Sequence, residues 1–218
     1  MRSAIVEGKT LLWEPPIGGS VENLASALHL LLGGDPLART LARVLHTAEL
    51  QGKISFEGVT EASADRAEDT LLLAWKWRLL IPVRTLKSHE WDDRVLLAEP
   101  GEIYEMPNVV RFLAEDALTS GRWVPDPGIA RLFRIMREPH WERMPMVVRR
   151  MRQRSMGGKI NGEQIVEICT ELGVGDHIDA MIGGLKGSGV MSPCMASRAR
   201  MAQERSPIYE MNPSLFIE

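Results

Sequence analysis

Arginine supplies all the positive charge in one segment of the second half of the chain. Eight arginines and no lysine occur between residues 131 and 154. A guanidinium group is planar and always charged, so it pairs with phosphate or carboxylate through two hydrogen bonds at once. Three kinds of partner are compatible with this pattern: acidic groups of the same chain, the phosphates of a nucleic acid, and an acidic protein.

The charge of the chain is unevenly divided, which bears on that choice. Residues 1–109 carry a net charge of −5, whereas residues 110–218 carry +2. If a nucleic acid is the partner, binding should depend on phosphates rather than on sequence and should weaken with salt. The candidate contacts are Arg131, Arg134, Arg143, Arg149, Arg150, Arg152, Arg154, Arg198 and Arg200.

Residue patterns typical of catalysis are lacking. The glycine-rich phrase at 183–189 resembles a phosphate-binding loop, but Lys186 precedes its glycine and the phrase closes a predicted helix instead of opening one. The histidines are scattered, and the neighbouring acids Asp92 and Asp93 do not converge on another acidic pair. We therefore expect a protein that is not an enzyme and that needs neither a cofactor nor a metal.

The bulk composition is that of a globular protein of 218 residues. The two cysteines, Cys169 and Cys194, form no CxxC pair and have no zinc-ligand spacing, which favours a reduced, cytoplasmic protein. The N-terminal residues contain no apolar signal core, and no apolar run approaches the length of a membrane span. We expect no membrane association.

The chain repeats itself with a constant register. Gly52-Lys53-Ile54 recurs as Gly158-Lys159-Ile160, and Ile103-Tyr104-Glu105-Met106 recurs as Ile208-Tyr209-Glu210-Met211, at offsets of 106 and 105 residues. Solenoid repeats are shorter, about 20–50 residues. The sequence therefore predicts two copies of one domain fold.

Each copy is predicted to begin with two helices. In the first copy Ser20 can cap a helix that ends at Gly33-Gly34, and Asp35-Pro36 can start the next. A short helix follows each Gly-Lys-Ile phrase, and then a third helix. In the second copy the third helix has an apolar stripe at Ile178, Met181, Ile182 and Leu185; in the first copy it covers 65–77.

The order of helices and strands, with the phrases 78–83 and 187–191 that leave each third helix, resembles a winged helix-turn-helix domain. The resemblance implies a mainly α fold with small β wings, in two tandem domains derived from a duplication. We expect a first domain over 1–118, a linker over 119–127 that is rich in Gly, Ser and Pro, and a second domain over 128–218. Each domain has an additional leading helix.

In DNA-binding members of that family the third helix usually enters the major groove. In the first copy its start is acidic, at Asp65, Glu68 and Asp69. With a core stripe at Leu72 and Trp75, its outer face would present Leu73 and Trp77, which suits a protein contact. Met195 and Met201 in the second wing are further candidates for partner binding, because methionine adapts to varied surfaces.

Two functions are compatible with these patterns. The winged-helix resemblance implies a nucleic-acid-associated regulator of the DNA-binding, transcription type, which would contact duplex DNA through the arginines. The alternative is a protein–protein adaptor or assembly module without direct DNA binding, supported by the acidic third helix of the first copy. A homodimer is compatible with either.

Overall fold

The computed structural model describes residues 19–86, 90–194 and 206–216. The fold is mainly helical, with two small three-stranded antiparallel sheets, one in each half, as the sequence predicted. Copy one contains α2 (Val21–Leu31), α3 (Ala38–Gln51), β1 (Lys53–Ser55), α4 (Phe56–Ser63), α5 (Ala67–Lys76), β2 (Ile81–Pro82) and β3 (Ile103–Glu105). Helix α6 (Asn108–Ser120) follows. Copy two contains α7 (Pro125–Ile135), α8 (Met144–Arg154), β4 (Lys159–Asn161), α9 (Gly162–Glu171), α10 (Ile178–Gly187), β5 (Met191–Pro193) and β6 (Ile208–Met211).

The two sheets pair their strands in the same way. In copy one β3 lies between β1 and β2, and in copy two β6 lies between β4 and β5. Ile54 is opposite Tyr104 in the first sheet, and Ile160 is opposite Tyr209 in the second. The repeated phrases are therefore the paired strands themselves, and the prediction that they mark two similar structural units is confirmed.

Capping residues explain where several helices begin. The Ser20 hydroxyl accepts a hydrogen bond from the Asn23 N–H and starts α2. Ser55 and Asn161 occupy equivalent last positions of β1 and β4, and their side chains cap α4 and α9. Each strand therefore passes directly into a helix, which fixes the helix against the sheet.

The second helix begins later than we expected. Helix α3 starts at Ala38 instead of at Asp35-Pro36. The Asp35 carboxylate accepts a hydrogen bond from the Leu37 N–H at 2.8 Å, so it caps a turn that precedes the helix.

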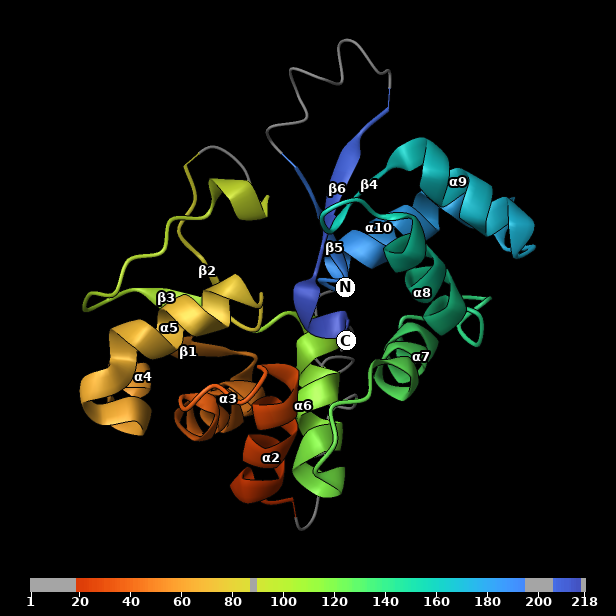
Figure 1. Ribbon diagram of the computed structural model, residues 1–218. Coiled ribbons are helices and arrows are strands. Elements are labelled where there is room, and N and C mark those ends of the chain that lie inside the picture. Colours follow the sequence, from red (N-terminus) through yellow and green to blue (C-terminus); the bar gives the residue numbers. More distant parts are fainter. Residues whose placement is uncertain (1–18, 87–89, 195–205, 217–218) are drawn as a thin grey trace, which may run out of the picture.

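The segment predicted as a linker is short and partly helical. Helix α6 runs through Ser120, α7 begins at Pro125, and Gly121 ends α6 in a left-handed conformation. Trp123 is buried, and its indole N–H donates to the Ser214 carbonyl at 2.8 Å. In Figure 1, α6 lies between the helices of copy one and those of copy two. The division into domains at 118 and 128 stays a prediction.

Most of the buried apolar side chains form one connected cluster that runs through both copies. Leu41 and Leu45 of α3 contribute to it from copy one, and Phe133 of α7 and Met151 of α8 contribute from copy two. Among the described helices, every one is too short or too polar to span a bilayer.

Tyr104 allows a test of the buried sheet of copy one. The side chain is 1% exposed, and its hydroxyl donates to the Leu97 carbonyl. Burial, with the nearby charges of Glu102 and Glu57, raises its pKa to about 12. The unfolded chain ionises Tyr near pH 10. We therefore expect the stability that Tyr104 contributes to be complete below about pH 10 and to be lost as the pH rises toward 12.

Ultraviolet titration and urea unfolding at alkaline pH would measure this. Tyr104→Phe should remove part of the loss of unfolding free energy at alkaline pH. Tyr209→Phe, at the equivalent position in copy two, is the control, because it keeps the part of that loss that Tyr104 causes. Ionisation of Tyr104 near its ordinary pKa in the folded protein would contradict the buried position.

Candidate functional site at the junction of the two copies

Several of the predicted arginines bind acidic groups of this chain. Arg131 on α7 lies 2.9 Å from Glu115 and 3.0 Å from Asp116 on α6 and stacks on the Phe112 ring. Arg154 pairs with Glu167 and Glu171 of α9. Arg149 pairs with Asp126. These guanidinium groups connect neighbouring helices.

The other predicted arginines differ in the contacts that their guanidinium groups make with the rest of the chain. Arg143 donates to the Leu172 carbonyl at 2.7 Å, at the C-terminal end of α9, and Arg152 lies over the Phe216 ring. Within the described residues, Arg134, Arg137 and Arg150 make no ion pair. Arg198, Arg200, Met195 and Met201 lie outside the described residues. Binding of phosphate by any of these arginines stays a prediction.

The orientation expected for the third helix of copy one is wrong. Leu71 and Ala74 form the buried stripe of α5, whereas Leu72, which we expected in the core, is 61% exposed. Leu73 and Trp77 are half-buried and pack against the core. Three consecutive leucines are compatible with more than one buried face of the helix. The sequence therefore did not determine which face of α5 packs against the core.

In copy two the predicted stripe is confirmed. Met181 and Leu185 are fully buried on α10, and Ile178 and Ile182 pack beside them. Asp179 and Lys186 are exposed. A Cβ on Gly184 would lie 3.4 Å from Phe133, an ordinary van der Waals distance, so α10 packs beside α7 at this position.

Both third helices end in the same way. The Leu79 N–H donates to the Ala74 carbonyl and the Val190 N–H donates to the Leu185 carbonyl, at 2.9 and 3.1 Å. The residue before each donor is left-handed, with φ of 52° at Arg78 and 79° at Gly189. Glycine adopts this conformation freely, while an L side chain costs about 1–2 kcal/mol there. Arg78 is thus a strained residue where the other copy has glycine.

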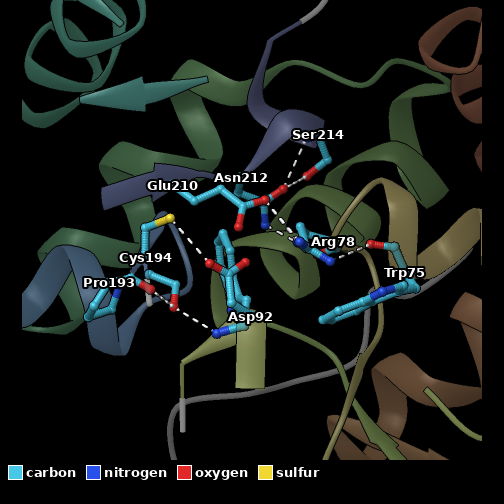
Figure 2. Close-up of polar contacts among 10 residues, drawn as sticks. Trp75, Arg78, Asp92, Pro193, Cys194, Glu210, Asn212 and Ser214 are labelled. Atoms are coloured by element: carbon cyan, nitrogen blue, oxygen red, sulfur yellow. Dashed lines mark hydrogen bonds and ion pairs between the residues drawn. The ribbon is translucent and has the colours of Figure 1, made fainter. Parts of the chain in front are cut away.

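Asn212 binds both of these helix ends. It is fully buried, and its Nδ2 donates to the Arg78 carbonyl at 3.2 Å and to the Gly189 carbonyl at 3.1 Å. Its Oδ1 accepts from the Ser214 N–H and the Ser214 hydroxyl, at 3.0 and 2.7 Å. Figure 2 shows Asn212 between Ser214 and Arg78. All the hydrogen-bonding capacity of this amide is satisfied.

The Arg78 side chain explains why the strain is retained. Its Nη2 lies 2.9 Å from the Glu210 carboxylate of β6, and its guanidinium lies 3.9 Å from the centre of the Trp75 ring and 5.7 Å from that of Trp91. Stacking and a two-donor ion pair are interactions that a glycine here would not make. The ion pair joins copy one to the central strand of copy two.

Pro107 makes the corresponding contact from copy one to copy two. It follows β3 at the position that Asn212 occupies after β6. It lies against Gly189, where an added Cβ would come within 2.4 Å of the Pro107 Cβ. The adjacent Val109 N–H donates to the Ser188 carbonyl at 2.9 Å. Each copy thus places the end of its last strand on the end of the other copy's third helix. Such reciprocal contacts are typical of an interface with two-fold symmetry. We call the surfaces around Arg78, Asn212, Gly189 and Pro107 the junction.

The wings also meet at the junction. The Trp91 N–H donates to the Ser192 hydroxyl at 3.0 Å, and the Cys194 thiol donates to the Asp92 carboxylate at 3.2 Å. Figure 2 shows this second contact. A cleft of about 860 Å³ lies beside them and is lined by residues of both signs, including Arg94, Glu105 and Lys186. Arg94 and Glu105 are paired at 3.0 Å, so the cleft presents no dominant charge.

A second hollow is bounded mainly by residues with apolar side chains. It has a volume of about 460 Å³, and we call it the Phe216 groove; its walls are Leu30, Leu31, Leu32, Gly33, Trp77, Arg152, Gly158, Met211, Pro213 and Phe216. Leu30 at its rim is 71% exposed. The groove brings together two residues that the sequence analysis assigned to different surfaces, Trp77 and Arg152.

Arg78, Glu210 and Asn212 were not among the residues that the sequence predicted to be functional. A signal existed for Arg78, because the strand pairing places Pro82 and Pro193 at equivalent positions and aligns Arg78 with Gly189. The phrases 78–83 and 187–191 do not begin at equivalent positions, so comparing them did not reveal this difference. Asn212 carried no comparable signal, since its partners are up to 134 residues away.

The described residues contain no cluster of three or more metal-ligating side chains. A protein-family model matches residues 22–218, and the chain belongs to that family. The match includes all the residues of the junction. Comparisons with curated proteins and with solved structures gave no significant match.

The buried amide of Asn212 leads to a stability prediction. Asn212→Ala should lower the free energy of unfolding by about 3 kcal/mol, because it leaves buried carbonyl groups and the buried Ser214 without their partners. Urea unfolding would measure it. The matched control is Asn108→Ala, whose exposed amide makes a long 3.4 Å contact with the Gly187 carbonyl and should cost little. Equal effects of the two changes would contradict the role of Asn212.

Proposed function

We propose that the protein is a non-enzymatic assembly module made of two winged-helix units, and that it binds a protein partner through the outer face of α5. In each copy the order of elements is two helices, a strand, two helices and two further strands. This order supports the winged-helix assignment, in which α5 and α10 are the third helices of the core motif.

The observation that carries the proposal is the chemistry of the exposed face of α5. Glu68 and Asp69 are exposed in its first turn, Leu72 is exposed one turn later, and Lys76 is exposed at its end. Carboxylates at the start of a third helix would face phosphates in a DNA complex and repel them. An exposed leucine among acidic residues instead suits a protein partner with apolar and basic groups.

The surface of α10 supports the same conclusion. Its exposed residues include Asp179, Gly183 and Lys186, and the described part of this helix has no arginine, asparagine or glutamine to read base edges. The C-terminal ends of both third helices are held in the junction, so these ends already have a structural use.

A nucleic-acid-associated function remains a second candidate because of one observation. Arg134, Arg137 and Arg150 are exposed on or beside α7 and α8 and make no ion pair within the described residues. Three cations could neutralise a few phosphates without reading sequence.

The partner proposal is tested by replacing Leu72. Leu72→Ser should abolish the enrichment of specific proteins on the immobilised full chain, while leaving the midpoint of urea unfolding nearly unchanged because the side chain is exposed. Val166→Ser on α9, a similarly exposed apolar residue, is the matched control. Quantitative mass spectrometry of the retained proteins gives the result. The same protein set on the wild type, the Leu72 variant and the control would contradict the proposal.

Titration with labelled duplex DNA separates the two candidates. At about 50 mM salt we expect fluorescence anisotropy to show no saturable binding, since the third helices carry carboxylates and three of the candidate arginines pair with carboxylates of this chain. Saturable binding that weakens steeply at about 200 mM salt and is reduced by Arg150→Glu would favour the nucleic-acid candidate instead.

A further inference from the structure

The end of α7 carries exposed cations beside an exposed methionine. Arg134 and Arg137 make no ion pair within the described residues, and Met136 is 42% exposed. The Arg134 guanidinium lies 5.6 Å from the centre of the Trp141 ring. A Cβ on Gly184 of α10 would lie 3.5 Å from the Met136 Cε, so Met136 lies beside a part of α10 that has no side chain. We call Arg134, Met136 and Arg137 the α7 basic surface.

Arg137 has a backbone conformation that glycine adopts more easily. Helices α2 and α7 end with the same two backbone hydrogen bonds, one donated three residues back, by Gly33 or Arg137, and the next donated five residues back. The φ angles of Gly33 and Arg137 are 64° and 60°. An L side chain is strained in this conformation.

The strain at Arg137 differs in its use from the strain at Arg78. Arg78 forms an ion pair with Glu210 that a glycine would not make. Arg137 is exposed and has no such pair among the residues that the structure describes. A strained backbone that makes no compensating contact inside the molecule favours a contact with another molecule.

The outer face of α5 has the complementary charge. Asp65 precedes the helix and Glu68 lies in its first turn; both are exposed, and in the described part of the chain neither pairs with a cation. Arg66 pairs with Asp69 at 3.4 Å. Leu72, one turn after Glu68, is 61% exposed. We call Asp65, Glu68 and Leu72 the α5 acidic surface.

We infer that the α7 basic surface of one molecule binds the α5 acidic surface of a second copy of this chain. The inference rests on the proposed function, in which the outer face of α5 binds a protein, and it identifies that protein. Each surface combines two like charges with one exposed apolar side chain. Guanidinium groups would face carboxylates while Met136, whose side chain adapts to varied surfaces, contacts Leu72.

The two surfaces do not lie together within one molecule. In Figure 1, α5 and α7 lie on opposite sides of α6. The contact therefore joins different molecules, and it uses two different surfaces instead of one surface twice. A contact of this kind repeats from molecule to molecule and gives a ring or an open chain, not a closed two-fold dimer.

Charge reversal in the full chain tests the contact. Sedimentation velocity at about 100 µM protein, within the range of weak association, should show oligomers of the wild type. Asp65→Lys with Glu68→Lys should weaken self-association at least about tenfold, because like charges then face each other. Arg134→Glu with Arg137→Glu should have the same effect for the same reason.

Matched controls make the same charge changes at exposed residues away from both surfaces. These controls are Glu22→Lys with Glu163→Lys, and Arg43→Glu with Arg150→Glu. Both glutamates lie in the first turn of a helix, as Glu68 does, so the effect on helix stability is comparable. The controls should associate as the wild type does, and urea unfolding of every variant checks that the fold is intact.

Mixing the two charge-reversed variants gives a result that a damaged fold would not give. In the mixture the new lysines of one variant face the new glutamates of the other, and the unchanged surfaces are also complementary. Association should therefore return, although each variant alone stays monomeric. Raising the salt from about 50 to about 500 mM should weaken association of the wild type and of the mixture, because exposed charges are screened.

Three outcomes would overturn the inference: a wild type that stays monomeric, charge-reversed variants that associate as the wild type does, or a mixture that does not recover association. Failure of the proposed function gives a different result. If the wild type stays monomeric but retains other proteins through Leu72, the outer face of α5 binds a different protein. If Leu72→Ser changes neither self-association nor the retained proteins, the proposed function fails as well.

Discussion

The arrangement of the two copies depends on one buried amide. Asn212 has two N–H donors, and each is bonded to the carbonyl at the end of a third helix, one in each copy. A buried amide must have its hydrogen bonds satisfied, because the water that would otherwise bind it is excluded. Moving either copy would break one of these bonds. The ion pair of Arg78 with Glu210 and the packing of Pro107 on Gly189 form only in the arrangement that Asn212 fixes.

The fold was largely predictable from the sequence, because it depends on local patterns. The repeated strand phrases, the serine before α2 and the stripe of α10 all concern residues a few positions apart. The rotation of α5 was not predictable, since Leu71, Leu72 and Leu73 satisfy several helix phases and only packing selects one. The junction was not predictable either. Arg78 and Glu210 are 132 residues apart, and their contact follows from how complete units dock. The same holds for Arg131, whose acidic partners lie on another helix.

The arginines illustrate how a composition can suggest more than one use. Their planar guanidinium groups suit phosphate, but they suit carboxylates and backbone carbonyls equally well. In the structure Arg131, Arg149 and Arg154 pair with carboxylates, and Arg143 binds a helix end. Four of the eight arginines of this segment therefore hold helices together, and the surface of α5 becomes the more informative guide to function.

The difference between Arg78 and Gly189 also determines which units can pair. If two molecules associated through their first copies alone, the position of Gly189 would be taken by an arginine, and its Cβ would lie about where a Cβ comes within 2.4 Å of Pro107. That pairing is sterically blocked, whereas the pairing of a first with a second copy is not. A newly made chain therefore has one correct mate for its first unit, and the nearest one is its own second unit. The single missing side chain at Gly189 thus favours the pairing of unlike units over the pairing of two first units.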